Sequence, residues 1–207
     1  WYFVGCSGLC FYLCYEMEKL TTVTIGSNVT SMGEHVFSKC TNIEKVVWNA
    51  KNYAIPANKE AAPFFDICSQ IKSITFGEAV KHIPAYLCSG MVKLTTITIP
   101  NSLSTIGTSA FEGCTRLGEL KLGINVEEIA AKAFAGCTRM YDIYCYATYP
   151  PFADASSFAN YNVYLYVPCE NQRDYILDIV WGEFKFIECI ESEDVTTEGV
   201  VVTPSTN

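Results

Sequence analysis

Residues 94–137 read LTTITIPNSLSTIGTSAFEGCTRLGELKLGINVEEIAAKAFAGC and contain one apolar pattern twice. The first copy begins at Leu94 and ends at Cys114, and the second begins 23 residues later at Leu117 and ends at Cys137. A pattern that returns at a short fixed period cannot bury each copy alone, so the copies must stack around one continuous core. The duplication therefore predicts a repeat solenoid.

The same pattern extends over most of the chain. Its leading aliphatic position recurs with spacings of 23, 28, 23, 23 and 23 residues, so one coil carries a five-residue insertion. This column consists of Leu20, Ile43, Ile71, Leu94, Leu117 and Met140. Apolar residues follow three and five positions later, which is the alternation of a half-buried strand. These inward pairs are Val23/Ile25, Val46/Trp48, Ile74/Phe76, Ile97/Ile99, Leu120/Leu122 and Ile143/Cys145. We expect these strands to pair in parallel as one continuous sheet.

Composition narrows the class of protein. The chain has 207 residues, half of them apolar, which suffices for one elongated domain. Its formal net charge is −8, with 22 acidic residues against 14 basic ones. Because a nucleic-acid binder needs a basic surface, we expect no nucleic-acid partner. No run approaches the roughly eighteen apolar residues of a membrane helix, so we expect no membrane insertion of this segment.

Eleven cysteines could form disulfides or bind a metal, but most of them fall on the apolar columns. The last column holds Met17, Cys40, Cys68, Met91, Cys114 and Cys137. Because methionine alternates with cysteine there, the shared property is that of a small or flexible apolar side chain. Two further cysteines, Cys14 and Cys88, stand in the column of Phe37, Phe65, Phe111 and Phe134. We expect packed, reduced thiols, although neighbouring coils bring Cys114 and Cys137 close enough for a bridge in principle.

No motif for catalysis or metal binding is present. The run Cys6, Cys10, Cys14 lacks the Cys-x2-Cys pairs of a structural zinc site, and we expect it to be core. The two histidines, His35 and His82, share their columns with chemically unrelated residues, so we expect both columns to face solvent. No nucleophile elbow, phosphate-binding loop or dinucleotide-binding glycine pattern occurs. We therefore expect no enzyme, no catalytic residue, no metal site and no cofactor.

The repeat pattern resembles the BspA-type leucine-rich repeat of surface proteins from host-associated anaerobic bacteria. The resemblance rests on Leu-x-x-Ile-x-Ile-Pro, Ile-Gly and Ala-Phe-x-x-Cys and covers about residues 9–145. Cys14 and Cys88 replace the Phe, and Pro84 replaces the Gly. It implies a right-handed leucine-rich-repeat superhelix with one parallel strand per coil of about 23 residues, a second short extended piece and a single helical turn at Ala-Phe-x-x-Cys.

We divide the chain into three parts. Residues 1–145 are expected to form the solenoid, with about six coils, an incomplete first coil and a loop at 49–63 that bulges from the stack. We interpret that loop as a tolerated insertion rather than a binding site. Residues 1–19 repeat the tail of a later coil, so we expect more protein before Trp1, where a targeting signal would lie.

Residues 146–190 leave the period and resemble the closing cap of the same family. The run 161–168 alternates as a strand, Tyr175 and Ile179 fit one face of a short helix, and a turn from Trp181 to Phe184 follows. We interpret the aromatic residues here as cap packing rather than a sugar-stacking platform. Residues 191–207 are acidic and threonine-rich, which predicts a linker, and their end resembles either the start of a truncated fibronectin-type domain or a free tail.

The resemblance implies export and contact with host proteins. We expect a non-enzymatic, adhesion-type binding module of an exported bacterial protein, at the cell surface or extracellular, and monomeric. Its partner would be an extracellular protein, such as a host matrix protein, or a glycan. The alternative is a structural spacer that carries other domains.

We place the binding surface on the outward residues of the strands. These residues are Thr22, Thr24, Lys45, Val47, Ser73, Thr75, Thr96, Thr98, Glu119, Lys121, Asp142 and Tyr144. A row of threonines needs no ligand to explain it, because threonine is a good strand former that tolerates solvent. Tyr144 beside Lys121 and Asp142, however, gives a mixed apolar and charged end that is typical of contact hot spots.

Overall fold

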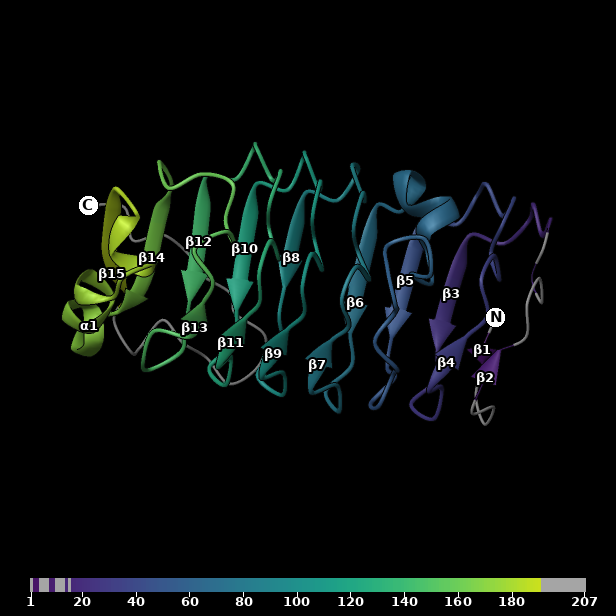
Figure 1. The fold of residues 1–207 in the computed structure, drawn as a ribbon, viewed down its shortest axis with the longest axis horizontal. Coiled ribbons are helices and arrows are strands. Elements are labelled where there is room, and N and C mark those ends of the chain that lie inside the picture. Colours follow the sequence, from purple (N-terminus) through teal and green to yellow (C-terminus); the bar gives the residue numbers. More distant parts are fainter. Residues whose placement is uncertain (1, 4–7, 10–13, 15, 191–207) are drawn as a thin grey trace.

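The computed structural model describes residues 2–3, 8–9, 14 and 16–190, so Cys6, Cys10 and the expected linker at 191–207 lie outside the described residues. Its main strands stand side by side along the long axis of the molecule (Figure 1). They are β1 Tyr2–Phe3, β3 Thr22–Ile25, β5 Lys45–Trp48, β6 Ser73–Phe76, β8 Thr96–Thr98, β10 Glu119–Leu122, β12 Asp142–Cys145, β14 Tyr164–Pro168 and β15 Phe186–Ile190. The fold is the predicted leucine-rich-repeat solenoid of stacked parallel strands.

The register of the strands is the predicted one. Val23 pairs with Val46 and Val46 with Ile74, while Leu120 pairs with both Ile97 and Ile143. The leading aliphatic column and the inward strand residues are all buried. Since the side-chain period of a strand is two, this register leaves the intervening residues on the outer face.

The expectation of one continuous sheet is wrong at one place. Hydrogen-bonded pairing gives one sheet in the order β1-β3-β5-β6 and another in the order β15-β14-β12-β10-β8, although β6 and β8 are neighbours in the stack (Figure 1). Asn49, Gly77 and Tyr146 each donate a backbone hydrogen bond to the preceding coil. Pro100 stands at the same position and has no N–H, so the bond from β8 to β6 cannot form there.

A second row of short strands follows the first turn of the coils. It consists of β2 Gly8–Leu9, β4 Ser31–Met32, β7 His82–Ile83, β9 Thr105–Ile106, β11 Glu128–Ile129 and β13 Phe152–Ala153. Pairing joins β2 to β4 and runs through β7, β9, β11 and β13, but the coil with the insertion has no strand between β4 and β7. Because the insertion displaces that strand, the second row is divided at residues 49–63.

Tight turns replace the expected helical turn at Ala-Phe-x-x-Cys. The N–H of Glu112 donates to the oxygen of Ser109, and the N–H of Cys114 donates to that of Phe111. The backbone is left-handed at Ser109 (φ 54°) and at Gly113 (φ 73°). A left-handed residue cannot continue a right-handed helix, so each turn ends after one hydrogen bond.

The coil with the insertion shifts its core register by one residue. Phe64 and Ile67 are buried and take the places expected for Phe65 and Cys68, which are only half-buried. The Phe64 ring stacks on Phe37 with centroids 5.6 Å apart. The 3-10 helix η1, Phe65–Gln70, occupies this corner and accommodates the extra residue before the next strand.

The other cysteines of this column are buried as expected, and they also form hydrogen bonds. The thiol of Cys40 donates to the oxygen of Cys14 at 2.6 Å, and that of Cys137 to the oxygen of Phe111 at 3.3 Å. Each bond joins one coil to the preceding one. The column therefore binds neighbouring coils to each other as well as filling the core.

The cap comprises η2 Cys169–Asn171, α1 Gln172–Leu177 and η3 Trp181–Glu183, which close one end of the stack (Figure 1). Tyr175 and Trp181 are fully buried, and their polar atoms donate to the oxygens of Ala147 and Pro151 at 2.7 Å each. The expectation for Ile179 is wrong, since α1 ends at Leu177 and Ile179 is 88% exposed. No helix in the described part is long and apolar enough to cross a membrane.

A disulfide between Cys169 and Cys189 holds the cap, with the Cα atoms 4.5 Å apart. Cys169 follows directly after β14, and Cys189 lies in β15, the strand that pairs with β14. This pair was not predicted from the sequence. Both residues lie outside the repeat, where column arguments do not apply.

Candidate functional site

The outward residues predicted to bind form two parallel files on the strand face. One file runs Thr96, Glu119, Asp142 across β8, β10 and β12, and the other runs Thr98, Lys121, Tyr144. Earlier strands continue the same files with Thr22, Lys45, Ser73 and with Thr24, Val47, Thr75. All twelve side chains are exposed or half-buried. Their pairing places them on one surface, interrupted only by the break between β6 and β8.

Beyond β12 the two files become aromatic. In the first file Asp142 pairs with Tyr164, and Tyr164 pairs with Phe186. In the second file Tyr144 pairs with Tyr166. We call Tyr144, Tyr164, Tyr166 and Phe186 the aromatic end of the strand face.

The rings of the aromatic end stack on one another. The centroids of Tyr144 and Tyr166 lie 4.6 Å apart with planes 11° from parallel, and those of Tyr164 and Phe186 lie 4.6 Å apart at 16°. Two cations border the stack, since the Nζ of Lys121 lies 5.6 Å from the Tyr144 centroid and that of Lys185 lies 5.3 Å from the Phe186 centroid. Such contacts restrict the rings, so the surface is largely preformed.

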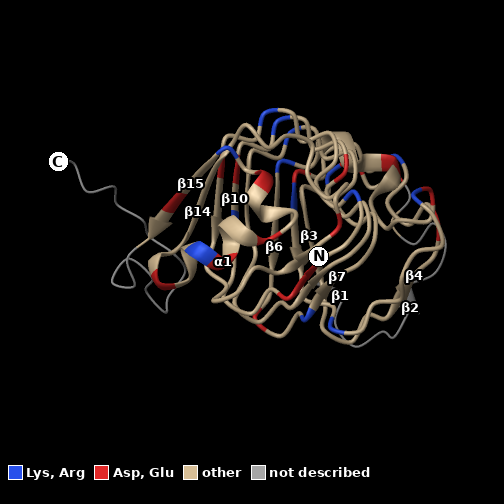
Figure 2. Ribbon diagram, turned by 60° about the vertical axis from the view of Figure 1, so that its left-hand side comes forward, with Lys and Arg blue, Asp and Glu red and all other residues tan. Residues whose placement is uncertain are grey.

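Of the two carboxylates beside these rings, those of Glu119 and Asp142, only Glu119 has an ion-pair partner in the part of the chain that the structure describes. The Nζ of Lys121 lies 3.2 Å from a carboxylate oxygen of Glu119 on the same strand. Asp142 lies on β12 as the register partner of Glu119 on β10, and its carboxylate has no hydrogen bond or ion pair within the described residues. Its burial, together with the nearby Glu119 carboxylate, raises the pKa of Asp142 above its ordinary value. Acidic and basic positions are otherwise interspersed along the molecule (Figure 2).

The absence of a side chain at Gly118 leaves room for the Tyr141 ring at the edge of this surface. A Cβ atom added at Gly118 would lie 2.3 Å from the Tyr141 ring, so the ring covers the bare backbone of the neighbouring coil. Tyr141 is 55% exposed and precedes Asp142 in the chain. The exposed Tyr141 ring, packed over Gly118, extends the apolar surface around Asp142.

Tyr164, Tyr166 and Phe186 were not predicted as site residues, because all aromatic residues after 145 were expected to pack in the cap. That interpretation fits Tyr175 and Trp181, which are buried. The signal for the strand-face residues was available for β14, since the expected strand at 161–168 alternates. Extending the outward files into it gives Tyr164 and Tyr166.

Neither histidine belongs to a metal-binding group within the described residues. The Nδ1 of His35 lies 2.8 Å from Asp66, and this contact raises the pKa of His35. The expectation that its column faces solvent is wrong for Ser109, which is only 3% exposed. The ring of His82 is half-buried, with its Nε2 at 3.5 Å from the oxygen of Tyr53. The described residues contain no group of three or more His, Cys, Asp or Glu side chains that could hold a metal.

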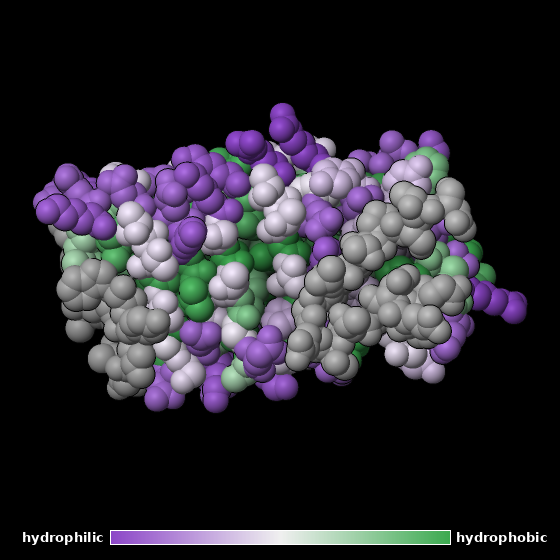
Figure 3. Space-filling model, turned by 180° about the vertical axis from the view of Figure 1, so that it is seen from behind, coloured by the Kyte–Doolittle hydropathy of each residue, from purple (hydrophilic) through white to green (hydrophobic). Residues whose placement is uncertain are grey.

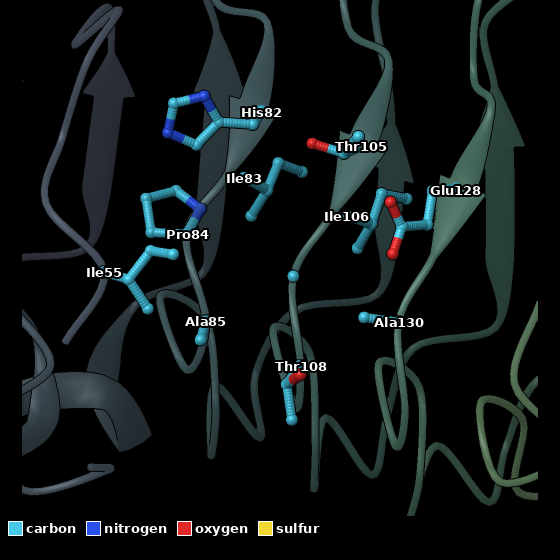
Figure 4. A pocket seen from close by; sticks show the side chains of 11 residues that line it. Ile55, His82, Ile83, Pro84, Ala85, Thr105, Ile106, Thr108, Glu128 and Ala130 are labelled. Atoms are coloured by element: carbon cyan, nitrogen blue, oxygen red, sulfur yellow. The ribbon is translucent and has the colours of Figure 1, made fainter. Parts of the chain in front are cut away.

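A hollow of about 400 Å³ lies at the second row of strands (Figure 4). Ile83 and Ile106 line it, Ile55 from the insertion forms one wall, and His82 and Glu128 stand at its rim. Seen from behind the main sheet, the molecule exposes apolar side chains between polar edges (Figure 3). The insertion thus contributes to a surface depression, which makes it the second candidate site.

Solved structures of bacterial repeat proteins share this fold. The T. pallidum leucine-rich repeat protein has a TM-score of 0.56 and 21% identity, with 80% of this chain and 73% of that chain covered. The pneumococcal vaccine antigen PcpA has a TM-score of 0.55 and 14% identity, with 86% of this chain and 42% of that one covered. At these identities the likeness shows the fold alone. No curated protein matches this sequence.

The family assignment follows from the repeats themselves. The model of the BspA-type leucine-rich repeat region matches residues 7–59 and 61–164 in six copies. The match extends beyond residue 145, in agreement with β13 and β14 continuing the stack. The chain belongs to the BspA-type leucine-rich repeat family.

Proposed function

We propose that this chain is a non-enzymatic binding module of an exported bacterial surface protein, and that it binds an extracellular protein through the aromatic end of the strand face. The observation that carries the proposal is the stack of Tyr144 on Tyr166 beside Tyr164 and Phe186. Partly exposed aromatic residues held rigidly lose little conformational freedom on binding, and tyrosine is enriched at interaction hot spots.

Two observations support an extracellular location. The disulfide between Cys169 and Cys189 suits an oxidising compartment, because disulfides rarely persist in a reducing cytosol. The second is the match to the BspA-type leucine-rich repeat family, a repeat that resembles those of bacterial surface proteins. Together they favour display outside the cell.

The proposal is tested by binding the recombinant module to an array of host matrix proteins and glycans, with Tyr144→Ala/Tyr166→Ala as the variant. Removing both rings should lower the affinity for a protein ligand at least tenfold, since central hot-spot aromatics contribute about 2 kcal/mol or more. The matched control is Tyr149→Ala/Phe152→Ala, which removes two rings that are 69% and 70% exposed outside the strand face.

Thermal melts accompany each variant, because cross-strand ring pairs also stabilise the sheet by roughly 0.2–1 kcal/mol each. If the two double variants bind the ligand with equal affinity and melt as the original protein does, the binding site does not lie at the aromatic end. The hollow lined by Ile55 would then be tested with Ile55→Ser. A module that binds nothing on the array, in any variant, would favour the structural spacer, and binding only to glycans would favour a carbohydrate receptor.

A further inference from the structure

The two files of the strand face differ in the residue that neighbours their first tyrosine, which is Tyr144 on β12 in the second file and Tyr164 on β14 in the first. In the second file, the Lys121 ammonium lies 5.6 Å from the centroid of Tyr144, whose ring stacks on Tyr166. In the first file, Tyr164 stacks on Phe186, and its register partner on the other side is Asp142. The residue beside Tyr164 on β12 is therefore an acid, whereas the residue beside Tyr144 on β10 is a lysine.

The position beside Tyr164 is suited to a positive charge. The carboxylate of Asp142 has no hydrogen-bonding or ion-pair partner in the described part of the chain, and Glu119 stands beside it in the same file. Lys121 compensates Glu119 alone, with 3.2 Å between Nζ and the carboxylate oxygen. A cation placed here would neutralise Asp142 and pack on Tyr164, as Lys121 neutralises Glu119 and packs on Tyr144.

We propose that the partner inserts an arginine side chain against Tyr164, with its guanidinium paired to Asp142. This inference rests on the proposed function and names the chemistry that the aromatic end recognises. Arginine fits better than lysine because its planar guanidinium stacks on a ring and donates two parallel hydrogen bonds to one carboxylate. Tyr164 is 43% exposed and Asp142 is half-buried, so both can be reached from outside.

The surroundings favour a protein segment over an anionic or neutral ligand. Glu119, Asp142 and Glu188 lie on the two files within these strands, against Lys121 on the second file and Lys185 at the edge beside Phe186. A sulfated or phosphorylated ligand would meet this negative charge unfavourably. A neutral glycan would stack on the rings but leave Asp142 without a counter-charge.

The test uses three short peptides that differ at one position. They are acetyl-Thr-Val-Xaa-Val-Thr-amide with arginine, with lysine and with citrulline, which has the shape of arginine without its charge. Their binding to the whole chain is followed by calorimetry and by tyrosine chemical shifts. We expect the arginine peptide to bind at least tenfold more tightly than the citrulline peptide, because only the charged guanidinium forms a charge-assisted hydrogen bond with the carboxylate.

The matched variants are Asp142→Asn and Glu127→Gln, an exposed acid elsewhere on the coils. Asp142→Asn should lower the affinity for the arginine peptide at least tenfold without lowering the melting temperature, since the carboxylate has no partner among the described residues to lose. Glu127→Gln should change neither. Tyr164→Leu should weaken the arginine peptide several-fold through loss of the stacking plane.

Two results would overturn the inference: equal affinities of the arginine and citrulline peptides, including no binding of either at millimolar concentration, or an arginine affinity that Asp142→Asn leaves unchanged. Neither result touches the proposed function, which depends on the array ligand and the Tyr144→Ala/Tyr166→Ala variant. If that variant abolishes binding to the array ligand while the peptides fail, only the arginine assignment is lost. If the array ligand ignores that variant as well, both proposals fail.

Discussion

The Sγ of Cys114 donates a hydrogen bond to the backbone oxygen of Cys88 in the preceding coil, 3.2 Å away. Both residues are fully buried. Met91, in the same column as Cys114, has no donor and can only pack. The column thus tolerates either side chain for packing, while cysteine adds a hydrogen bond between coils that net contributes on the order of 1 kcal/mol or less.

This burial predicts an order of thiol labelling. Burial raises the pKa of Cys88 and of Cys40, and a hydrogen bond with Cys137 together with burial raises that of Cys114, so little thiolate is available for reaction. Burial also raises the pKa of Cys68, but this residue is only half-buried, at the displaced corner of the insertion coil. With iodoacetamide and peptide mass mapping, we expect Cys68 to be modified first among the thiols of the described residues. Modification of Cys114 before Cys68 in the native protein would contradict this packing.

The strand register predicts opposite effects for two adjacent substitutions. Ile97 is 3% exposed and points into the core, whereas Thr98 is exposed on the strand face. Ile97→Asp should abolish cooperative melting, because an unpaired buried charge costs several kcal/mol. Thr98→Asp is the control and should melt within about 0.5 kcal/mol of the original protein, as exposed substitutions do. Soluble, cooperatively folded Ile97→Asp would refute the register.

Backbone conformation at one turn predicts which of two substitutions leaves the protein more stable. Lys39 has φ 61° at the position where Gly113 and Gly136 have φ 73° and 76°. Its ion pair with Glu16, 2.7 Å long, is exposed on both sides and contributes little. We expect Lys39→Gly to be more stable than Lys39→Ala by about 1 kcal/mol in urea unfolding, because only glycine adopts this conformation without strain. Equal stability of the two variants would argue against the left-handed turn.

Side-chain period made the core of the solenoid predictable. The columns from Leu20 to Met140 and the inward strand residues were identified because an error of one position would have exposed an entire strand. The burial of Phe64 and Ile67 was not predicted. The spacing of the repeats gives the number of inserted residues but does not show that η1 shifts the buried positions by one. The left-handed turn residues carry no common side-chain signal, as Ser109 and Lys132 illustrate.

The site was predictable only as far as the repeat extends. Asp142 and Tyr144 lie in the last regular strand, and alternation alone places them on the outer face. Phe186 joins them because β15 pairs with β14 across a stretch of cap that has no period. The disulfide was not predictable for the same reason, because Cys189 lies beside Cys169 through the pairing of β15 with β14, which no sequence period indicates.

The disulfide between Cys169 and Cys189 predicts a dependence of the cap on oxidation. It closes a loop with a sequence separation of 20 that contains α1 and η3, and closing such a loop contributes about 3 kcal/mol. Cys189→Ser should therefore lower the melting temperature by several degrees, and reductant should lower that of the original protein to the same value. Reductant added to Cys189→Ser is the control and should change nothing. The ring of Phe186 in β15 stacks on Tyr164, with the centroids 4.6 Å apart. The tyrosine resonances of the aromatic end should therefore broaden in the variant. Identical melting of the oxidised and reduced proteins would show that the cap is held by Tyr175 and Trp181 without the bridge.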